Sequence, residues 1–372
     1  MTWIELPEDH PTPSLVVDSQ TVHRNLERMQ SYCGQHGLKL RPHTKTHKSI
    51  EMARRQIELG AGGLTVAKVG EGECMSEASN DLFLAYPTVG RSRLERLGRL
   101  ARRCIGDLGG KLSVGVDSKE GVEAIAEVAR RVGVPIGILA DLDVGFHRTG
   151  IESGNLAEEF CAWIASQPGI RFEGVMCFPG HILPNATAEA WKNYSERLES
   201  VIEGLRRQGI EVTTVSGGST PTAKESHRNP VLNEIRPGTY IYNDWNEVRL
   251  GVAEIEDCAA RVAATVVSVP ARNKCVLDCG SKTLSSDRNC VDPEGGFGVV
   301  MEFPDAKITR LSEEHGEVTF SEEYSGPRPY VGQRVWVLPN HICVCVNLQN
   351  YFFLAERGEL TEIPVDARGL LV

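Results

Sequence analysis

The sequence lacks the features that would tie a protein to a membrane or to nucleic acid. In its 372 residues no apolar run reaches the roughly 20 residues that span a bilayer. The first residues, MTWIELPEDHPTP, lack the basic and apolar regions of a signal peptide. A formal net charge of -10 leaves no basic surface for nucleic acid or for an anionic membrane. We therefore expect a cytoplasmic protein whose ligands are small molecules.

A disulfide framework and internal repeats are absent as well. The 11 cysteines are odd in number and follow no repeating spacing, which favours reduced thiols. What the sequence does have is an ordinary globular composition, with 41% hydrophobic and 24% charged residues. A chain of this length and composition can bury a large core, and we expect one larger and one smaller domain.

The first two thirds of the chain have the pattern of repeated βαβ units. From about residue 38 to residue 243, short apolar runs alternate with polar segments of helix length. Eight such runs predict a (β/α)8 barrel of the TIM type, in which the ligand-binding residues follow the strands. The candidate strands are LKLRP, GLTVA, DLFLAY, KLSVGV, IGILADLD, FEGVMCF, EVTTVS and TYIYN.

The last third predicts a second, mostly antiparallel β domain. Beyond about residue 250, β-branched runs are separated by glycine, proline, asparagine and aspartate. We place the barrel at residues 14–250 and the β domain at residues 251–372 together with 1–13. The run SLVVD, which precedes a helix that begins near Ser19, could belong to either. The predicted strands of the β domain are RVAATVVSVP, KCVLDCG, FGVVMEF, AKITRL, QRVWVLP, ICVCVNL and YFFLAE.

The densest group of reactive side chains is RPHTKTHK, residues 41–48, between an apolar run and a predicted helix. Lys45 lies there between His43 and His47. A lysine that attacks an aldehyde must first lose its proton, and neighbouring cations or apolar walls favour the neutral amine. A basic surface turn is the alternative interpretation of this segment on its own.

The segment PHTKTHK, with TPSLVVD upstream and GLTVAKVGEGE downstream, resembles the D-threonine aldolase and D-serine dehydratase family. The resemblance extends over nearly the whole chain. It implies a pyridoxal-phosphate enzyme with an alanine-racemase-like barrel and a β domain, in which Lys45 binds the aldehyde of the cofactor. It also implies a homodimer.

Residues 141–150, DLDVGFHRTG, follow a predicted strand and contain a second candidate for cofactor binding. They are similar to the segment of this barrel class whose arginine hydrogen-bonds the phenolic oxygen of the cofactor, which makes Arg148 the candidate. A guanidinium stays protonated and would keep that oxygen anionic. The alternative is a buried Arg148 that pairs with Asp143 for structure alone.

Two glycine-containing loops, SGGST at residues 216–220 and RPGTY at residues 236–240, follow the last predicted barrel strands. Each alone is an ordinary turn. Glycines let backbone amides approach a ligand and hydroxyls add donors, and barrels bind phosphate in this region. With the family resemblance in agreement, we assign to the cofactor phosphate Gly218, Ser219, Thr220, Gly238 and Thr239, with Tyr240 and Tyr242 nearby.

The segment LPNHICVCVN contains a candidate metal site. His341 and Cys343 are two residues apart on a predicted strand, so both side chains can reach one ion, although packing alone would produce the same spacing. Imidazole with thiolate favours zinc over magnesium or calcium. The resemblance implies a histidine and a cysteine ligand in dehydratase-like members, and an aspartate at the place of Cys343 in aldolases. We expect a divalent metal, zinc or manganese.

Together these residues predict a metal-dependent lyase that acts on D-3-hydroxy-amino acids. His181, in FPGH after a strand, could be the general acid–base for the substrate hydroxyl or a structural histidine. With Lys45 and His181 as catalytic residues, we expect retro-aldol cleavage of D-threonine-like substrates to glycine and an aldehyde.

Three alternatives stay open. Cys343 favours dehydration of D-serine or D-3-hydroxyaspartate to a keto acid and ammonia. A non-catalytic pyridoxal-phosphate carrier would resemble the barrel alone, without the β domain and the HxC pair. Racemisation would leave the metal motif without a task.

Overall fold

The computed structural model describes residues 3–372, which form two compact units. The barrel unit comprises residues 27–238 and 369–372, and the β unit comprises the described residues up to 26 together with 239–368. The helix α1 (Ser19–Gln35) contains the first of these boundaries. Among the described residues, no helix has the length and apolar character of a membrane span.

The barrel unit is built on parallel strands that pair in the order β2-β10-β9-β8-β6-β5-β4-β3, with β7 added beside β6. A parallel bridge between His43 and Thr65 joins the segment after β2 to β3, so the sheet closes on itself. This confirms the predicted barrel. The strands are β2 (Lys39–Leu40), β3 (Leu64–Val66), β4 (Asp81–Leu84), β5 (Lys111–Val116), β6 (Ile136–Asp143), β7 (Ile151–Glu152), β8 (Ile170–Cys177), β9 (Thr214–Gly217) and β10 (Glu234–Ile235).

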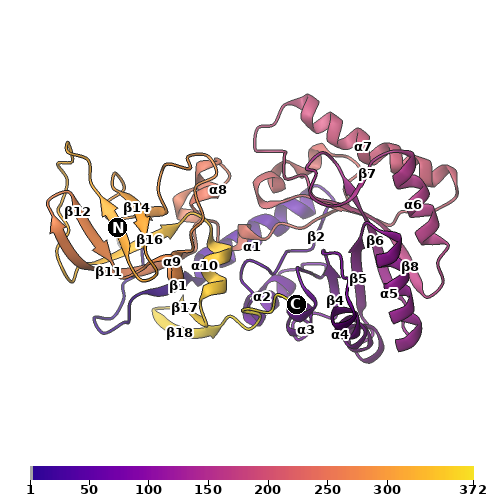
Figure 1. The fold of residues 1–372 in the computed structure, drawn as a ribbon, viewed down its shortest axis with the longest axis horizontal. Coiled ribbons are helices and arrows are strands. Elements are labelled where there is room, and N and C mark those ends of the chain that lie inside the picture. Colours follow the sequence, from indigo (N-terminus) through magenta and orange to yellow (C-terminus); the bar gives the residue numbers. More distant parts are fainter. Residues whose placement is uncertain (1–2) are drawn as a thin grey trace. The chain divides into compact units, whose positions relative to one another are not determined.

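Helices lie around these strands (Figure 1). Apolar side chains are buried among the strands. Phe83, Leu139 and Met176, from strands β4, β6 and β8, pack together in the interior. Most residues of β6 are buried, as expected for a strand covered on both faces. The helices are α2 (Ile50–Glu58), α3 (Val69–Met75), α4 (Arg91–Ala101) with its irregular continuation η1 (Arg102–Asp107), α5 (Lys119–Val132), α6 (Asn155–Ala165), α7 (Ala188–Arg207) and the 3-10 helix η2 (Thr220–Arg228).

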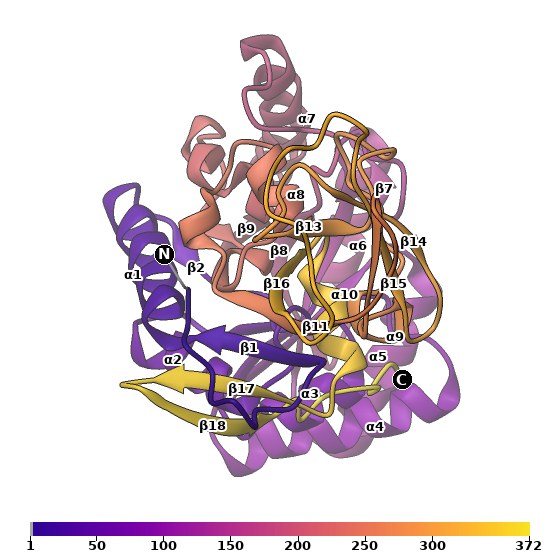
Figure 2. The ribbon, with the colours of Figure 1, turned by 90° about the vertical axis from the view of Figure 1, so that its left-hand side faces the viewer.

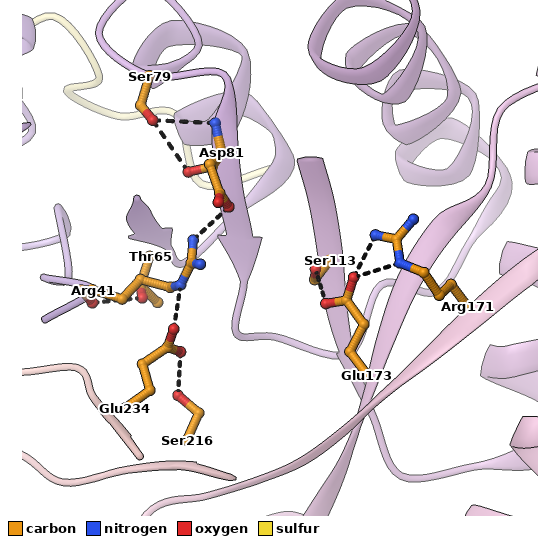
Figure 3. Close-up of polar contacts among 9 residues, drawn as sticks. All are labelled: Arg41, Thr65, Ser79, Asp81, Ser113, Arg171, Glu173, Ser216 and Glu234. Carbon is orange, nitrogen blue, oxygen red and sulfur yellow. Dashed lines mark hydrogen bonds and ion pairs between the residues drawn. The ribbon is translucent and has the colours of Figure 1, made fainter. Parts of the chain in front are cut away.

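A polar network lies at the amino ends of several barrel strands (Figure 3). The Arg41 guanidinium forms ion pairs with Asp81 at 2.7 Å and with Glu234 at 2.8 Å, which are the first residues of β4 and β10. Glu234 also accepts a hydrogen bond from the Ser216 hydroxyl at 2.6 Å. Because these groups satisfy one another, they tie the segment after β2 to the amino ends of β4 and β10.

The β unit is a mostly antiparallel sheet, as predicted. Its strands pair in the order β14-β15-β12-β11-β1-β17-β18, and β16 pairs with β11 and β13. The strands are β1 (Ser14–Asp18), β11 (Ala260–Ala271), β12 (Lys274–Leu277), β13 (Gly298–Val300), β14 (Lys307–Leu311), β15 (Gly316–Thr319), β16 (Arg334–Pro339), β17 (Tyr351–Glu356) and β18 (Glu359–Pro364). Its short helices are η3 (Thr239–Ile241), α8 (Trp245–Arg249), η4 (Ile255–Asp257), α9 (Ser281–Leu284) and α10 (Ile342–Leu348).

Backbone hydrogen bonds explain where the boundary between the units falls. Strand β1 pairs antiparallel with β11 and parallel with β17 (Figure 2), which places SLVVD in the β unit. The segment after Gly238 also bonds within this unit, because Asn246 N donates to Asn340 O at 3.1 Å. The boundaries therefore lie at residues 26 and 238, whereas the sequence placed them near residues 14 and 250.

Two predicted strands are wrong. TYIYN begins with the 3-10 helix η3, and the last barrel strand is the two-residue β10 just upstream. ICVCVNL forms the helix α10, so His341 and Cys343 do not alternate on a strand. The buried residues of α10 have the 3.6-residue period of a helix, and Val344 between them is exposed; they are Ile342, Cys343, Cys345 and Val346.

Candidate functional site

The loop that carries Lys45 connects β2 to α2 and is held by its neighbours on both sides. His43 N donates to Pro237 O at 2.9 Å, and Thr44 N donates to Thr65 O at 2.9 Å. Lys45 is exposed, and among the described residues its ammonium has no hydrogen-bond or ion-pair partner. The backbone of the loop is thus held by hydrogen bonds, and it places the unpaired Lys45 amine beside the carboxyl end of β3.

Lys48, the second lysine of this loop, forms an ion pair inside the protein. It is buried, and its Nζ lies 3.4 Å from Oε2 of Glu71 in α3. The other oxygen of Glu71 accepts a hydrogen bond from the Thr44 hydroxyl at 2.5 Å. Glu71 is fully buried, and its carboxylate joins the Lys45 loop to α3. Of the two lysines, Lys45 is therefore the candidate for binding an aldehyde.

The two histidines that flank Lys45 are neutral at neutral pH. Burial lowers the pKa of His43 well below its ordinary value, and the positive charges of Lys45 and Arg236 lower it further. Burial lowers the pKa of His47 to about 4, although its 3.2 Å hydrogen bond with Gln56 opposes the shift. The imidazole rings on either side of Lys45 in the sequence therefore add no positive charge to the loop.

Of the two loops predicted to hold phosphate, the one at residues 236–240 lies against both the other loop and the Lys45 loop. Gly238 N donates to the Thr220 hydroxyl at 3.2 Å. A Cβ on Gly238 would lie 3.0 Å from Thr46 Oγ1 and 3.2 Å from His43 O, so this close approach requires glycine. Ser219 precedes the first turn of η2, and Gly218 has a φ of +74°. Amides at the start of η2, hydroxyls and glycines form a set of donors that fits a phosphate.

Arg148 and His181 lie on the loops that follow β6 and β8. The Arg148 guanidinium carbon lies 4.5 Å from the ring centre of Phe178 and 5.3 Å from that of Phe146. A Cβ on Gly145, in the loop that carries Arg148, would lie 3.2 Å from His181 Nε2. The structure therefore places His181 against the loop that carries Arg148.

The alternative role of Arg148, a buried pair with Asp143, is wrong. Arg148 is exposed, and among the described residues no ion pair joins it to Asp143. Asp143 instead accepts hydrogen bonds from His147 Nδ1 at 2.7 Å and from Gly145 N at 2.9 Å. The Arg148 guanidinium is left available for a ligand.

The protonation states near this cluster suit acid–base chemistry. Partial burial lowers the pKa of His181, and the charge of Arg197 adds to this effect, so the imidazole is neutral and can accept a proton. Burial raises the pKa of Asp141 to about 6, although the 2.8 Å hydrogen bond from the Thr149 hydroxyl opposes the shift. The sequence analysis did not select Asp141, because a lone aspartate at the end of a strand gives no signal of burial.

The candidate metal ligands lie in the β unit, at the start of α10. His341 is the residue before this helix and Cys343 is the second residue in it. His341 Nδ1 lies 2.9 Å from Oδ2 of Asp244, and Cys343 Sγ lies 3.8 Å from Thr239 Oγ1. Burial lowers the pKa of His341, but Cys343 and Asp244 outweigh it and raise the pKa above its ordinary value. Because Nδ1 is engaged, Nε2 is the ring nitrogen left for an ion.

These side chains fit a metal with open coordination positions. Imidazole and thiolate are zinc donors, and two or three protein ligands with open positions are typical of catalytic rather than structural sites. In the part of the chain that the structure describes, no three histidine, cysteine or acidic side chains converge as a closed metal site. Nearby Glu247 is buried, and its Oε2 has no hydrogen-bond partner among the described residues.

The remaining predicted residues are buried in the β unit. Thr239 and Tyr240 lie in η3, and Tyr242 follows it and packs against Phe352 at 6.3 Å between ring centres. Gly218, Ser219, Thr220 and Gly238 belong to the barrel unit. The sequence analysis also missed Asp244 and Glu71, whose partners lie far away in the sequence.

Sequence comparisons match both units to known families. Residues 17–245 match the family described as alanine racemase, N-terminal domain, and residues 259–355 match the putative serine dehydratase domain. A D-threonine aldolase from Arthrobacter sp. is 30% identical over 96% of this chain and 93% of that protein. A D-threo-3-hydroxyaspartate dehydratase from Delftia sp. (strain HT23) is 31% identical over 89% of this chain and 90% of that protein.

Solved structures agree with these matches. The D-threonine aldolase from Filomicrobium marinum superposes with a TM-score of 0.87 at 29% identity and covers 98% of each chain. Another solved structure is the metal-free form of a D-threo-3-hydroxyaspartate dehydratase in which one cysteine is replaced by alanine. It superposes with a TM-score of 0.85 at 28% identity and covers 96% of this chain and 98% of that one. These relatives are lyases of two kinds, aldolases and dehydratases.

Proposed function

Since the chain belongs to the D-threonine aldolase and D-serine dehydratase family of alanine-racemase-like lyases, we propose that it is a pyridoxal-phosphate and metal-dependent lyase that acts on D-amino acids with a 3-hydroxyl group. The reaction that we favour is retro-aldol cleavage of D-threonine-like substrates to glycine and an aldehyde. The observation that carries the proposal is the exposed, unpaired Lys45 on a loop that packs against the glycine-containing loop of residues 236–240, which in turn contacts the loop of residues 216–220.

The predicted cofactor-binding residues would divide the cofactor among them. Lys45 would bind its aldehyde, Arg148 would donate to its phenolic oxygen, and the phosphate would lie on the loops of residues 218–220 and 238–240. Tyr240 and Tyr242 stay predicted neighbours of that phosphate. Bound pyridoxal phosphate supplies an electron sink for the bond that breaks at the α carbon. The fixed positive charge of Arg148, which already stacks on Phe178, suits an anionic oxygen.

His341 and Cys343 would hold zinc or manganese, which would polarise the 3-hydroxyl of the substrate. The pairing of an imidazole with a thiol at the start of α10 supports this assignment. The expected homodimer and the expected cytoplasmic location stay predictions from the family resemblance and the composition.

The residues that move protons decide between the two reactions. Neutral His181 can take the proton of the 3-hydroxyl, which leads to cleavage of the bond between the α and β carbons. If Lys45 instead takes the α proton, the hydroxyl leaves and a keto acid and ammonia result. His181 favours the aldolase, whereas Cys343 favours the dehydratase of D-serine or D-3-hydroxyaspartate.

The match of residues 259–355 to the serine dehydratase domain counts against a carrier without catalytic activity. The experiment that separates the reactions is a product assay of one purified preparation with D-threonine, D-serine and D-threo-3-hydroxyaspartate. Glycine with acetaldehyde from D-threonine supports the aldolase. Keto acid and ammonia without any glycine would transfer the assignment to the dehydratase, and no turnover of any of the three substrates would contradict the proposed function.

A further inference from the structure

The Asp244 side chain contacts one candidate metal ligand, His341, and the backbone amide of Ile342, which precedes the other, Cys343. Its Oδ2 accepts a hydrogen bond from His341 Nδ1 at 2.9 Å and another from Ile342 N at 3.0 Å. Its Oδ1 accepts from Glu247 N at 3.1 Å. The carboxylate is fully buried, so these donors, rather than solvent, satisfy it.

The two bonds to Oδ2 fix different parts of the site. A carboxylate can only accept, so Nδ1 of His341 carries a proton and faces Asp244, and Nε2 is the ring nitrogen that an ion would bind. Ile342 lies between His341 and Cys343 and is the first residue of α10. The bond to its amide therefore fixes the start of the helix that carries Cys343.

We infer that Asp244 is a positioning residue for the metal, which orients the His341 ring and the first turn of α10 so that Nε2 and the Cys343 sulfur can bind the same ion. This inference rests on the metal that is part of the proposed function. Carboxylates that accept from the second nitrogen of a ligating histidine are typical partners in metal sites, and their loss weakens metal binding about 10- to 100-fold.

A purely structural role is the competing explanation, because Asp244 also caps α8 by accepting from Glu247 N. Asp18 offers a matched control in the same unit. It caps the start of α1 by accepting from Thr21 N at 3.1 Å and from Gln20 N at 3.3 Å, and no described contact joins it to His341 or Cys343. Asp18→Asn and Asp244→Asn thus make the same chemical change at two helix starts.

In Asp244→Asn, one carboxylate oxygen becomes an amide that donates. If Oδ1 keeps its bond to Glu247 N, the amide faces the Nδ1 and Ile342 donors, and the ring is driven to carry its proton on Nε2. That is the nitrogen that the metal needs. The expected result is about 10- to 100-fold weaker zinc binding in Asp244→Asn, with Asp18→Asn equal to the wild type.

The experiment is a titration of the chelator-treated full-length protein with Zn²⁺ against a chromophoric competitor, for the wild type, Asp244→Asn, Asp18→Asn and Cys343→Ala. Urea unfolding of the metal-free proteins measures the capping contribution separately. Zinc affinity of Asp244→Asn within about threefold of Asp18→Asn would overturn the inference while leaving the metal site in place. A wild type that binds no zinc, or Cys343→Ala that binds zinc as the wild type does, would overturn the metal site and the inference with it.

A second measurement needs no variant and therefore stands even if Asp244→Asn does not fold. In ¹⁵N-histidine-labelled wild type loaded with ¹¹³Cd²⁺, the ¹¹³Cd coupling is expected at Nε2 of His341, with a proton retained on Nδ1. Coupling at Nδ1 would overturn the inference, because a metal there would displace the bond to Asp244.

Discussion

Replacement of Glu71 by glutamine tests how the Lys45 loop is held. The Glu71 carboxylate is fully buried, 3.4 Å from the buried ammonium of Lys48, and it accepts from the Thr44 hydroxyl at 2.5 Å. Glutamine keeps the size of the side chain and can still accept from Thr44, but it leaves the Lys48 charge uncompensated. Breaking a buried ion pair on one side costs about 3 to 5 kcal/mol, so the free energy of unfolding should fall by about that amount.

The assay is urea unfolding followed by circular dichroism and by tryptophan fluorescence. Glu95→Gln is the matched control, because it breaks the Arg91–Glu95 pair, whose side chains are 93% and 45% exposed. That change should alter the free energy of unfolding by less than about 1 kcal/mol. In the double variant Lys48→Met/Glu71→Gln no buried charge is left unpaired, so it should be more stable than Glu71→Gln alone.

Two results would refute this account of the loop. One is a Glu71→Gln protein as stable as Glu95→Gln. The other is a double variant that loses the sum of the two single changes, since additivity would mean that Lys48 and Glu71 do not interact.

Three further changes test the site and its surroundings. His47 is neutral in the fold because burial lowers its pKa to about 4, whereas in the unfolded chain its pKa is about 6.5. The contribution of neutral His47 to the free energy of unfolding is therefore fully present above pH 6.5, and up to about 3 kcal/mol of it is lost as the pH falls towards 4. The free energy of unfolding of His47→Gln should lack this part of the pH dependence. A pH profile identical to that of the wild type would contradict the prediction. Gly238→Ala places a Cβ 3.0 Å from Thr46 Oγ1 and should weaken pyridoxal-phosphate binding about tenfold, as measured by fluorescence titration. In the control Gly34→Ala, where no atom lies within 4 Å of the new Cβ, the affinity for pyridoxal phosphate should equal that of the wild type. His181→Asn should lower the kcat of cleavage about 10²- to 10⁴-fold while cofactor binding stays intact, and full activity would remove His181 as the base.

The architecture was predictable because its signals are local and repeated. Alternating apolar runs and polar segments indicate the barrel, and reactive residues follow the ends of the strands, as Lys45 and Arg148 do. The β-branched runs after residue 250 indicate the second unit. These features depend on residue type and spacing alone, which the sequence contains in full.

The errors in the predicted strands arise where a short sequence segment is compatible with both a strand and a helix. ICVCV alternates like a strand, yet the pattern of buried residues, with Val344 exposed, is helical, and the Asp244 carboxylate satisfies the amide at the helix start. The last barrel strand has two residues, Glu234 and Ile235, too few to form a pattern, and the apolar TYIYN just after it took its place in the prediction.

The supporting residues of the candidate site were out of reach for a different reason. Asp244 pairs with His341, which lies 97 positions further along the chain. Glu71 anchors Lys48 from 23 positions away. Contacts of this kind come from the tertiary fold, and a single sequence contains no signal for them.

The most direct test of the central claim, that Lys45 binds the cofactor of this lyase, is borohydride reduction of the pyridoxal-phosphate-loaded protein followed by peptide mass mapping. The account predicts a phosphopyridoxyl group on the peptide with Lys45, its absence from Lys45→Ala, and its presence on Lys45 in Lys48→Met. A label on Lys48 or on another lysine, or no label at all in the loaded wild type, would contradict the account.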